Sequence, residues 1–280
     1  MNNELIDTFI NLAIKEDIGD GDHSSRSCIP QDATGKMKLL VKEEGILAGC
    51  EIGIKIFNKV DPAIKVEKFI NDGSEIKVGD VVLHAEGRVW SLLQAERLVL
   101  NVMQRMSGIA TRTNEYVIRL EGTSTRVLDT RKTTPGMRIL EKEAVKIGGG
   151  VNHRMGLYDM VMLKDNHIDF AGGIEKAVAA VKNYLKENNK DIKIEVEVRN
   201  FDELNEVLRV GGIHRIMLDN FSTDDTRKAV ELIDGRFETE SSGGITIDTL
   251  RDYAECGVDY ISVGALTHHI KSLDLSLKAF

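Results

Sequence analysis

The chain has 280 residues, of which 42% are hydrophobic, enough to bury the core of one large α/β domain or of two smaller ones. A formal net charge of -8 argues against a general binder of nucleic acid or of membrane surfaces, because the field of the whole molecule repels polyanions. Three distant cysteines without CxxC spacing favour neither a disulfide framework nor a zinc site. With no signal-peptide pattern and no long apolar run, we expect a cytoplasmic protein.

The first part of the chain, up to about residue 108, has a mixed pattern. Leu5–Ile14 has the spacing of an amphipathic helix, and a further helix is predicted from Ser91 to about Gly108. Three short strand-like segments lie between them, separated by Gly, Asp and Pro turns: Lys36–Val41, Ile64–Ile70 and Val81–Glu86. We interpret this part as a small α+β domain.

From Thr125 onward, predicted strands and helices alternate. The strands are Val127–Thr130, Met160–Asn166, Ile194–Val198, Ile216–Asn220, Phe237–Gly244 and Tyr260–Ala265. The helices between them are Met137–Ile147, Gly173–Leu185, Asp202–Val210, Asp224–Ile233 and Thr246–Cys256. Repeated βα units imply parallel strands, and the lack of a reversal signal favours a barrel over an open sheet.

Polar residues cluster where the predicted strands end. They are Asp129, Arg131 and Lys132; Lys164, Asp165, Asn166 and His167; Glu197; Asp219 and Asn220; Glu240, Ser241, Ser242, Gly243 and Gly244; and Gly264. In a βα barrel, catalytic groups lie at the carboxyl ends of the strands. The pattern therefore predicts one shared active site at this end.

Carboxylates occupy positions that the pattern predicts to be buried. Glu195 and Glu197 alternate with valines and should point to one face of their strand, and Asp219 follows an apolar run. A carboxylate inside a barrel needs a cation or a metal partner. Glu197 and Asp219 could flank a magnesium-bound diphosphate or stabilise positive charge on a sugar ring, whereas a solvated strand face is the alternative.

Two glycine-rich segments differ in their expected roles. Ser242–Gly244 precedes a helix predicted to begin near Thr246, so it could hold phosphate through backbone N–H groups or be an ordinary βα turn. Gly264, one strand later, favours the phosphate interpretation. The triplet Gly148–Gly150 follows a predicted helix, and we interpret it as a C-cap.

Cations are dense in the same part of the chain: Arg131, Lys132, His153, Arg154 and Lys164. If these side chains converge, they would hold a small dianion. A solvated surface is the alternative, above all for Arg138 and Lys142 on the intervening helix. Lys164 directly follows an apolar strand, so a Schiff-base aldolase that uses it as nucleophile is a second enzyme hypothesis.

Several motifs in order resemble the quinolinate phosphoribosyltransferase family. They are EDIGDGD (Glu16 to Asp22), AERLVLNVMQRMSGIAT (Ala95 to Thr111), TRKTTPGMR (Thr130 to Arg138), KIGGGVNHR (Lys146 to Arg154), KDNHI (Lys164 to Ile168), EVEV, LDN, ESSGGIT and GALTH. The similarity spans nearly the whole chain. Relatives of the family associated with molybdate transport also exist, but the intact TRK, NHR and KDNH motifs favour a catalytic member.

The resemblance implies a reaction and a set of roles. Quinolinate nitrogen would attack the anomeric carbon of phosphoribosyl pyrophosphate, releasing pyrophosphate, and loss of CO₂ would leave nicotinate mononucleotide for NAD biosynthesis. The implied carboxylate-binding residues are Arg131, His153, Arg154 and Lys164, with Arg97 from a partner subunit. Lys132, Glu197 and Asp219 would be catalytic, the last two serving ribose and Mg²⁺-diphosphate, and Ser242, Gly243, Gly244, Gly264 and His268 would hold phosphate.

The resemblance also implies the architecture. An N-terminal α/β sandwich domain, residues 1–108 joined by about 270–280, would pack on an open, incomplete α/β barrel of residues 109–269, in a homodimer or a higher oligomer with shared sites. Two departures from the family pattern stand out: His269 replaces a common serine, and the segment near Gly211–His214 is one residue longer. A lipoyl-type carrier module is a third hypothesis for Gly73–Gly87, but this segment lacks the lysine at a hairpin tip that such a carrier needs, so we interpret it as scaffold.

Overall fold

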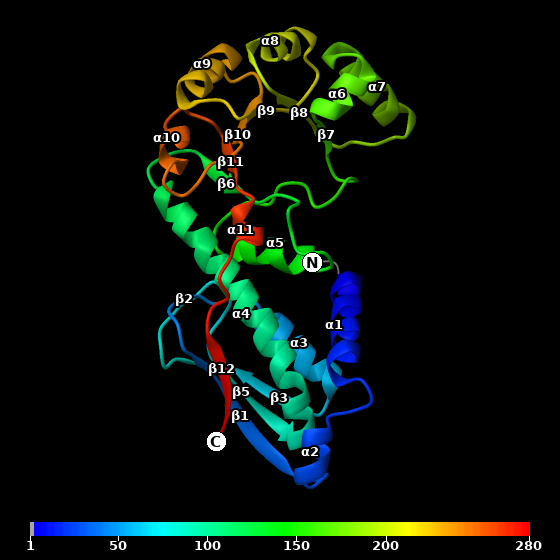
Figure 1. Cartoon of the computed structure of the whole chain (residues 1–280), viewed down its shortest axis with the longest axis vertical. Helices are drawn as coiled ribbons and strands as arrows, with labels where there is room; N and C mark the ends of the chain where they lie inside the picture. The colour runs from blue at the N-terminus through cyan, green and yellow to red at the C-terminus, as the bar shows by residue number, and fades with distance from the viewer. Residues whose placement is uncertain (1–2) are drawn as a thin grey trace. The chain divides into compact units, whose positions relative to one another are not determined.

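The computed structural model describes residues 3–280 and divides into two compact units (Figure 1). The first unit contains the chain up to Asn114, together with Lys132–Gly149 and Ala265–Phe280. The second contains Glu115–Arg131 and Gly150–Gly264. The domain limits expected from the sequence, at residues 108 and 269, stay a prediction.

The first unit contains a four-stranded antiparallel sheet. Its strand order is β12 (Leu275–Ala279), β1 (Thr34–Val41), β5 (Val81–Arg88) and β3 (Lys65–Lys68). A separate short pair joins β2 (Gly45–Ile46) to β4 (Glu75–Ile76). Along β1 every second side chain is buried, at Met37, Leu39 and Val41, so one face of the strand contributes to the core.

Helices complete the first unit: α1 (Asn3–Ile18), α2 (His23–Cys28), α3 (Cys50–Val60), α5 (Arg138–Ile147), α11 (Ala265–His268) and α4 (Val89–Arg119) as far as Asn114. The expectation that α4 ends near Gly108 is wrong. Gly108 lies in the middle of α4. A Cβ at this position would come within 2.2 Å of the Lys271 carbonyl oxygen, so the position needs glycine. The glycine thus allows a close backbone approach and does not stop the helix.

The second unit is built on a parallel sheet. Its strand order is β6 (Arg126–Leu128), β11 (Tyr260–Ser262), β10 (Glu238–Ser242), β9 (Arg215–Asp219), β8 (Ile194–Val198) and β7 (Val161–Leu163). No pairing joins the edge strands β6 and β7 within residues 3–280, so the barrel is open. A single parallel bridge from Leu128 to Val151 extends the β6 edge. The predicted fold class, an α/β sheet domain with an open parallel barrel, is confirmed.

The helices of this unit lie on the convex side of the curved sheet (Figure 1). They are α6 (Asp165–Ala171), α7 (Ile174–Glu187), α8 (Phe201–Val210), α9 (Thr223–Ile233) and α10 (Leu250–Ala254). Asn200 and Ser222 cap α8 and α9 by accepting hydrogen bonds from the N–H groups of Glu203 and Asp225. Among residues 3–280, no helix combines the length and apolar character that a membrane crossing requires.

The two faces of the parallel sheet differ in polarity. Ile194, Val196 and Val198 of β8 pack with Leu204 and Val207 of α8 in one apolar cluster. Each such side chain contributes roughly 1.5–3 kcal/mol when it leaves water. The alternate residues of the strand are glutamates. The apolar side chains therefore lie between the sheet and its helices, and the glutamate side chains lie on the opposite, concave face.

The strand register extends that charged concave face across the sheet. Glu195 is the partner of Arg215 on β9, and Arg215 is in turn the partner of Glu238 on β10. One level further along the strands, Glu197 and Glu240 both lie opposite Met217. The prediction that Glu195 and Glu197 share an interior face is therefore consistent with this register.

Candidate active site

Six strand ends meet at the carboxyl edge of the parallel sheet. In sheet order they carry Arg131 after β6, Gly264 after β11, Ser242 to Gly244 at the end of β10, Asp219 on β9, Glu197 on β8 and Lys164 after β7. Parallel strands place their carboxyl ends on one side of a sheet. The structure thus brings together, in one unit, most of the residues that the sequence singled out.

Lys164 and Glu197 form an ion pair between neighbouring strands. The Lys164 Nζ lies 2.6 Å from Glu197 Oε2, and the glutamate side chain is only 8% exposed. The lysine N-caps α6, a helix that the sequence pattern did not predict. A Schiff-base lysine needs its Nζ directed at a substrate carbonyl, whereas this Nζ is directed at the Glu197 carboxylate, so the geometry speaks against the aldolase.

Asp219 is held by two hydrogen bonds at the end of β9. The Ser242 hydroxyl donates to one carboxylate oxygen at 2.7 Å, and the Asn220 side-chain amide donates to the other at 2.7 Å. The Asn220 N–H also donates to the Ser242 carbonyl at 2.9 Å, which ties the end of β9 to that of β10. These contacts fix the direction in which the carboxylate points.

The turn after Ser242 requires glycine. Gly243 has φ +98°, and a Cβ there would lie 2.2 Å from Asn220 Oδ1, while Gly244 has φ +63° with open space around it. Backbone N–H groups in such a turn can approach an anion closely. The helix expected from Thr246 begins only at Leu250, so its N-terminus does not directly follow the glycines and that part of the prediction is wrong.

His153 and Arg154 follow the bridge that extends the β6 edge. The His153 N–H donates to the buried carboxylate of Asp129 at 2.8 Å, and Arg154 Nη1 donates to the Met160 carbonyl at 3.2 Å. Burial, and next the nearby charge of Arg131, lower the pKa of Arg154. Arg154 is therefore a buried cation with the charge of Arg131 nearby, which makes this part of the edge positively charged.

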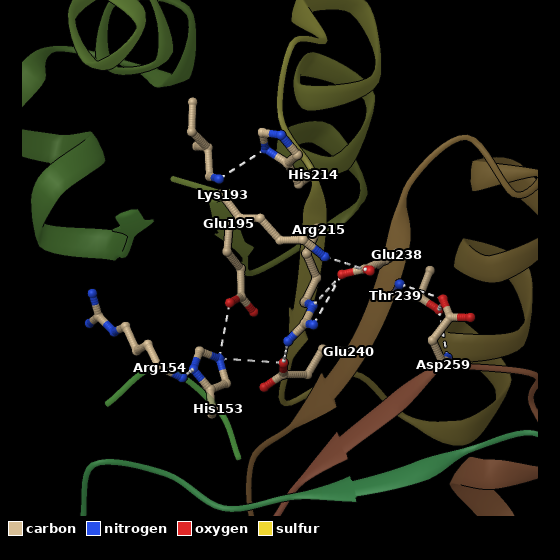
Figure 2. Close-up of polar contacts among 11 residues, drawn as sticks. His153, Arg154, Lys193, Glu195, His214, Arg215, Glu238, Thr239, Glu240 and Asp259 are labelled. Atoms are coloured by element: carbon tan, nitrogen blue, oxygen red, sulfur yellow. Dashed lines mark hydrogen bonds and ion pairs between the residues drawn. The ribbon is translucent and has the colours of Figure 1, made fainter. Parts of the chain in front are cut away.

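A buried polar cluster lies on the concave face of the sheet, nearer to the amino ends of the strands than this edge (Figure 2). His153 Nε2 lies 3.0 Å from Glu195 Oε2 and 3.5 Å from Glu240 Oε2, and Arg215 Nη1 lies 3.0 Å from the same Glu240 oxygen. Burial raises the pKa of Glu195 to about 7, and burial followed by the charge of Glu195 raises that of Glu240 to about 8. Sequence reasoning missed Arg215, whose only signal was a charge inside the apolar run Ile213–Leu218.

The remaining predicted residues, Arg97, Lys132 and His268, belong to the first unit. The Thr267 hydroxyl donates to the Lys132 carbonyl at 2.9 Å, so Lys132 and α11, which ends at His268, occupy adjacent segments. Lys142, for which a solvated surface was the alternative, is fully buried in α5, where the neighbouring Glu141 accepts a hydrogen bond from Arg105. That alternative is wrong for Lys142 because α5 buries more than one face.

An open parallel barrel whose carboxyl edge combines paired cations, two carboxylates and a glycine turn defines an α/β enzyme that acts on anionic substrates. Comparison with known proteins gives the family. The sequence profile of the quinolinate phosphoribosyl transferase C-terminal domain matches residues 109–278, and that of the N-terminal domain matches residues 22–107. The chain belongs to the quinolinate phosphoribosyltransferase family.

Individual relatives agree over almost the full chain. The mitochondrial quinolinate phosphoribosyltransferase [decarboxylating] 2 of Nicotiana glauca is 47% identical over 96% of this chain and 80% of its own length. A probable nicotinate-nucleotide pyrophosphorylase [carboxylating] of Bacillus subtilis is 41% identical over 99% and 94%. The crystal structure of NadC from Streptococcus pyogenes superimposes with a TM-score of 0.93 at 38% identity, covering 100% of this chain and 99% of that one.

Proposed function

We propose that the carboxyl edge of the parallel sheet transfers the phosphoribosyl group of phosphoribosyl pyrophosphate to quinolinate, with loss of CO₂, in NAD biosynthesis. Family membership supports this reaction. The observation that carries it is the arrangement of Lys164, paired with Glu197 at 2.6 Å, and Asp219, held by Ser242 at 2.7 Å, along one carboxyl edge of the sheet. Cations and oriented carboxylates at one edge suit an anionic substrate and a sugar that gains positive charge.

Quinolinate is the dianion that this arrangement suits. Its two adjacent carboxylates would be bound by Arg131, Arg154 and Lys164, with His153 beside them. Arginine offers a planar pair of donors to a carboxylate, and lysine adds a point charge. Nicotinate lacks the carboxylate next to the ring nitrogen, so it would make fewer of these contacts and could not release CO₂ from that position.

The second substrate would occupy the β9 to β11 side of the edge. Ser242, Gly243, Gly244 and Gly264 would hold phosphate groups through backbone N–H groups and a hydroxyl, with His268 as a further contact. Glu197 and Asp219 would lie beside the ribose. As the bond from the anomeric carbon to pyrophosphate lengthens, positive charge grows on the sugar ring, and fixed carboxylates stabilise that charge.

Magnesium fits this donor set. Glu197 and Asp219 offer only oxygen, the ligand type that Mg²⁺ prefers, and the hydrogen bonds from Ser242 and Asn220 hold the Asp219 carboxylate in a fixed orientation. A bound ion would neutralise diphosphate charge. These two residues would hold it directly or through the diphosphate of the substrate.

The chemistry conserves atoms and charge in two stages. The ring nitrogen forms a bond to the anomeric carbon while the bond to pyrophosphate breaks, giving a positively charged pyridinium. The bond from C2 to its carboxylate then breaks, the electron pair stays on C2 beside the cationic nitrogen, and a proton from Lys132 or water completes nicotinate mononucleotide. Lys132 would contact both substrates.

Assembly and location complete the proposal. A homodimer, or a higher oligomer built from it, would supply Arg97 from one subunit to the site of the other, and Arg97 is exposed in the single chain. The negative net charge agrees with a protein that binds neither nucleic acid nor membrane surfaces. The cytoplasm is the proposed location.

The deciding experiment incubates purified protein with quinolinate, phosphoribosyl pyrophosphate and Mg²⁺ and follows nicotinate mononucleotide and CO₂. Nicotinate in place of quinolinate is the matched control. Equal amounts of mononucleotide and CO₂ from quinolinate, with none from nicotinate, are expected. A folded protein that yields neither product from quinolinate would overturn the proposal.

A further inference from the structure

Three members of the buried cluster below the active edge, Glu195, Glu240 and Arg215, have no part in the proposed chemistry. Both glutamates are fully buried, and Arg215 is only 6% exposed. Buried charged groups cost stability compared with apolar residues of similar size. The fold does not need them, since the apolar layer between sheet and helices already supplies a core.

Contacts from four directions converge on His153. Its backbone N–H is bound by Asp129, at the end of β6. The N–H of Arg154 donates to Nδ1 at 2.6 Å, so the ring proton belongs on Nε2. That nitrogen faces Glu195 on β8 at 3.0 Å and Glu240 on β10 at 3.5 Å. The imidazole is therefore oriented by strands on both sides of β9.

Arg215 on β9 holds one of these glutamates in place. Its Nη1 lies 3.0 Å from Glu240, while Nε and Nη2 bond Glu238 at 3.1 and 3.0 Å. The guanidinium also stacks over the Tyr260 ring, with Cζ 4.2 Å from the centroid. The donor atoms of His153, Glu195 and Glu240 are close enough to hold a metal ion, but Arg215 already supplies positive charge to Glu240.

We propose that Glu195 and Glu240, the latter anchored by Arg215, are positioning residues that hold His153, and with it the adjacent Arg154, in the orientation that binds the quinolinate carboxylates. This inference rests on the proposed function. His153 and Arg154 are consecutive residues, and the Arg154 N–H donates to the His153 ring. A rotation of that ring would therefore also displace the backbone of Arg154. Removal of the glutamates should therefore weaken binding of quinolinate and spare phosphoribosyl pyrophosphate.

Three variants separate positioning from general structure. Glu195→Leu keeps the volume but removes the carboxylate beside Nε2, Glu195→Gln keeps a polar oxygen at that position, and Glu238→Gln is the matched control. Glu238 also contacts Arg215, but on the side away from His153, and its side chain is 33% exposed. Steady-state kinetics of each variant gives the KM for both substrates, and thermal unfolding shows that the variants are folded.

We expect Glu195→Leu to raise the KM for quinolinate by roughly ten-fold or more, the effect of one displaced charge-assisted hydrogen bond. The KM for phosphoribosyl pyrophosphate should stay within about two-fold, because His153 and Arg154 bind only quinolinate. Glu195→Gln should restore most of the quinolinate affinity, and Glu238→Gln should match the wild type. Unchanged quinolinate KM in Glu195→Leu, or an equal rise for both substrates, would overturn the positioning role.

A substrate-free measurement keeps this test independent of the reaction. Nitrogen NMR of histidine-labelled protein should show the His153 proton on Nε2 in the wild type and in Glu195→Gln, and a changed ring-nitrogen signature in Glu195→Leu. An identical signature in all three would contradict the inference. A wild-type protein that shows the Nε2 proton but makes no mononucleotide would instead contradict the proposed function.

Discussion

Lys164 and Glu197 lie 2.6 Å apart across the ends of two neighbouring parallel strands, where one cation serves both a buried carboxylate and the proposed quinolinate site. Replacing Lys164 by alanine should lower kcat/KM for quinolinate, with a loss of about 2–4 kcal/mol in transition-state stabilisation. The change removes a charged group from the site and leaves Glu197 without its cation. The measurement is steady-state kinetics. Wild-type efficiency in this variant would contradict the assignment.

Lys193 provides the control for that experiment. It also pairs with a glutamate, at 2.8 Å from Glu238, and its side chain is 50% exposed compared with 43% for Lys164. However, Lys193 precedes β8, at the amino end of the strand. Lys193→Ala should therefore leave kcat/KM unchanged, which separates removal of a substrate-binding cation from removal of any exposed ion pair.

Gly243 tests the turn proposed to bind phosphate. Gly243→Ala combines a φ of +98° with a Cβ 2.2 Å from Asn220 Oδ1, so it should destabilise the fold by about 1–3 kcal/mol and raise the KM for phosphoribosyl pyrophosphate. Gly244→Ala has open space and should cost about 1 kcal/mol. Urea unfolding and substrate kinetics check both, and equal effects of the two changes would be the contrary result.

Glu240 predicts a pH dependence of stability. Its pKa is raised from 4.5 to about 8 in the folded chain, so between these pH values the folded state keeps a proton that the unfolded state has lost. The contribution of Glu240 to the free energy of unfolding is therefore fully present below pH 4.5 and is lost as the pH rises through about 8. Urea unfolding from about pH 6 to 8.5 should show a declining free energy of unfolding. The decline should be smaller in Glu240→Gln, where only Glu195, with a pKa raised to about 7, still contributes to it. Glu231→Gln, at an exposed position, should decline like the wild type, and parallel curves for all three would refute the raised pKa.

If each active site is shared between two subunits, a mixture of two inactive variants should regain activity. An inactive Arg97→Ala protein mixed with an inactive Lys164→Ala protein should regain about a quarter of wild-type activity, because half of the dimers are hybrids with one intact site each. Native mass spectrometry verifies the exchange of subunits. Exchange without recovery would show that Arg97 and Lys164 act within one subunit or not together.

Strong local periodicity made the second unit predictable. The alternation of glutamate and valine in Ile194–Val198 matches β8 residue for residue. The predicted strands that end at Asn220 and Gly244 match β9 and β10 to within one or two residues at each end. Since parallel strands align their carboxyl ends, the edge that carries Lys164, Glu197 and Asp219 followed from order alone.

What the sequence left out depends on contacts between distant segments. The pattern indicated that Glu195 needs a cation or metal partner, but those found, Arg215 and His153, lie 20 and 42 positions away and meet it only through strand order. Gly108 looked like a helix end because local pattern carries no information on the Lys271 carbonyl that it accommodates. The late start of α10 likewise has no local signal in Thr246–Thr249.

The apolar seam between the parallel sheet and its helices has an evolutionary consequence. Because Val196, Ile216 and their neighbours stabilise the scaffold from the convex side, the more exposed charges at the carboxyl edge, such as Lys164, can be exchanged without disturbing that apolar layer. A lineage could therefore acquire specificity for a different small anion by altering a few residues at the strand ends, with the stability of the scaffold offsetting the cost of each change.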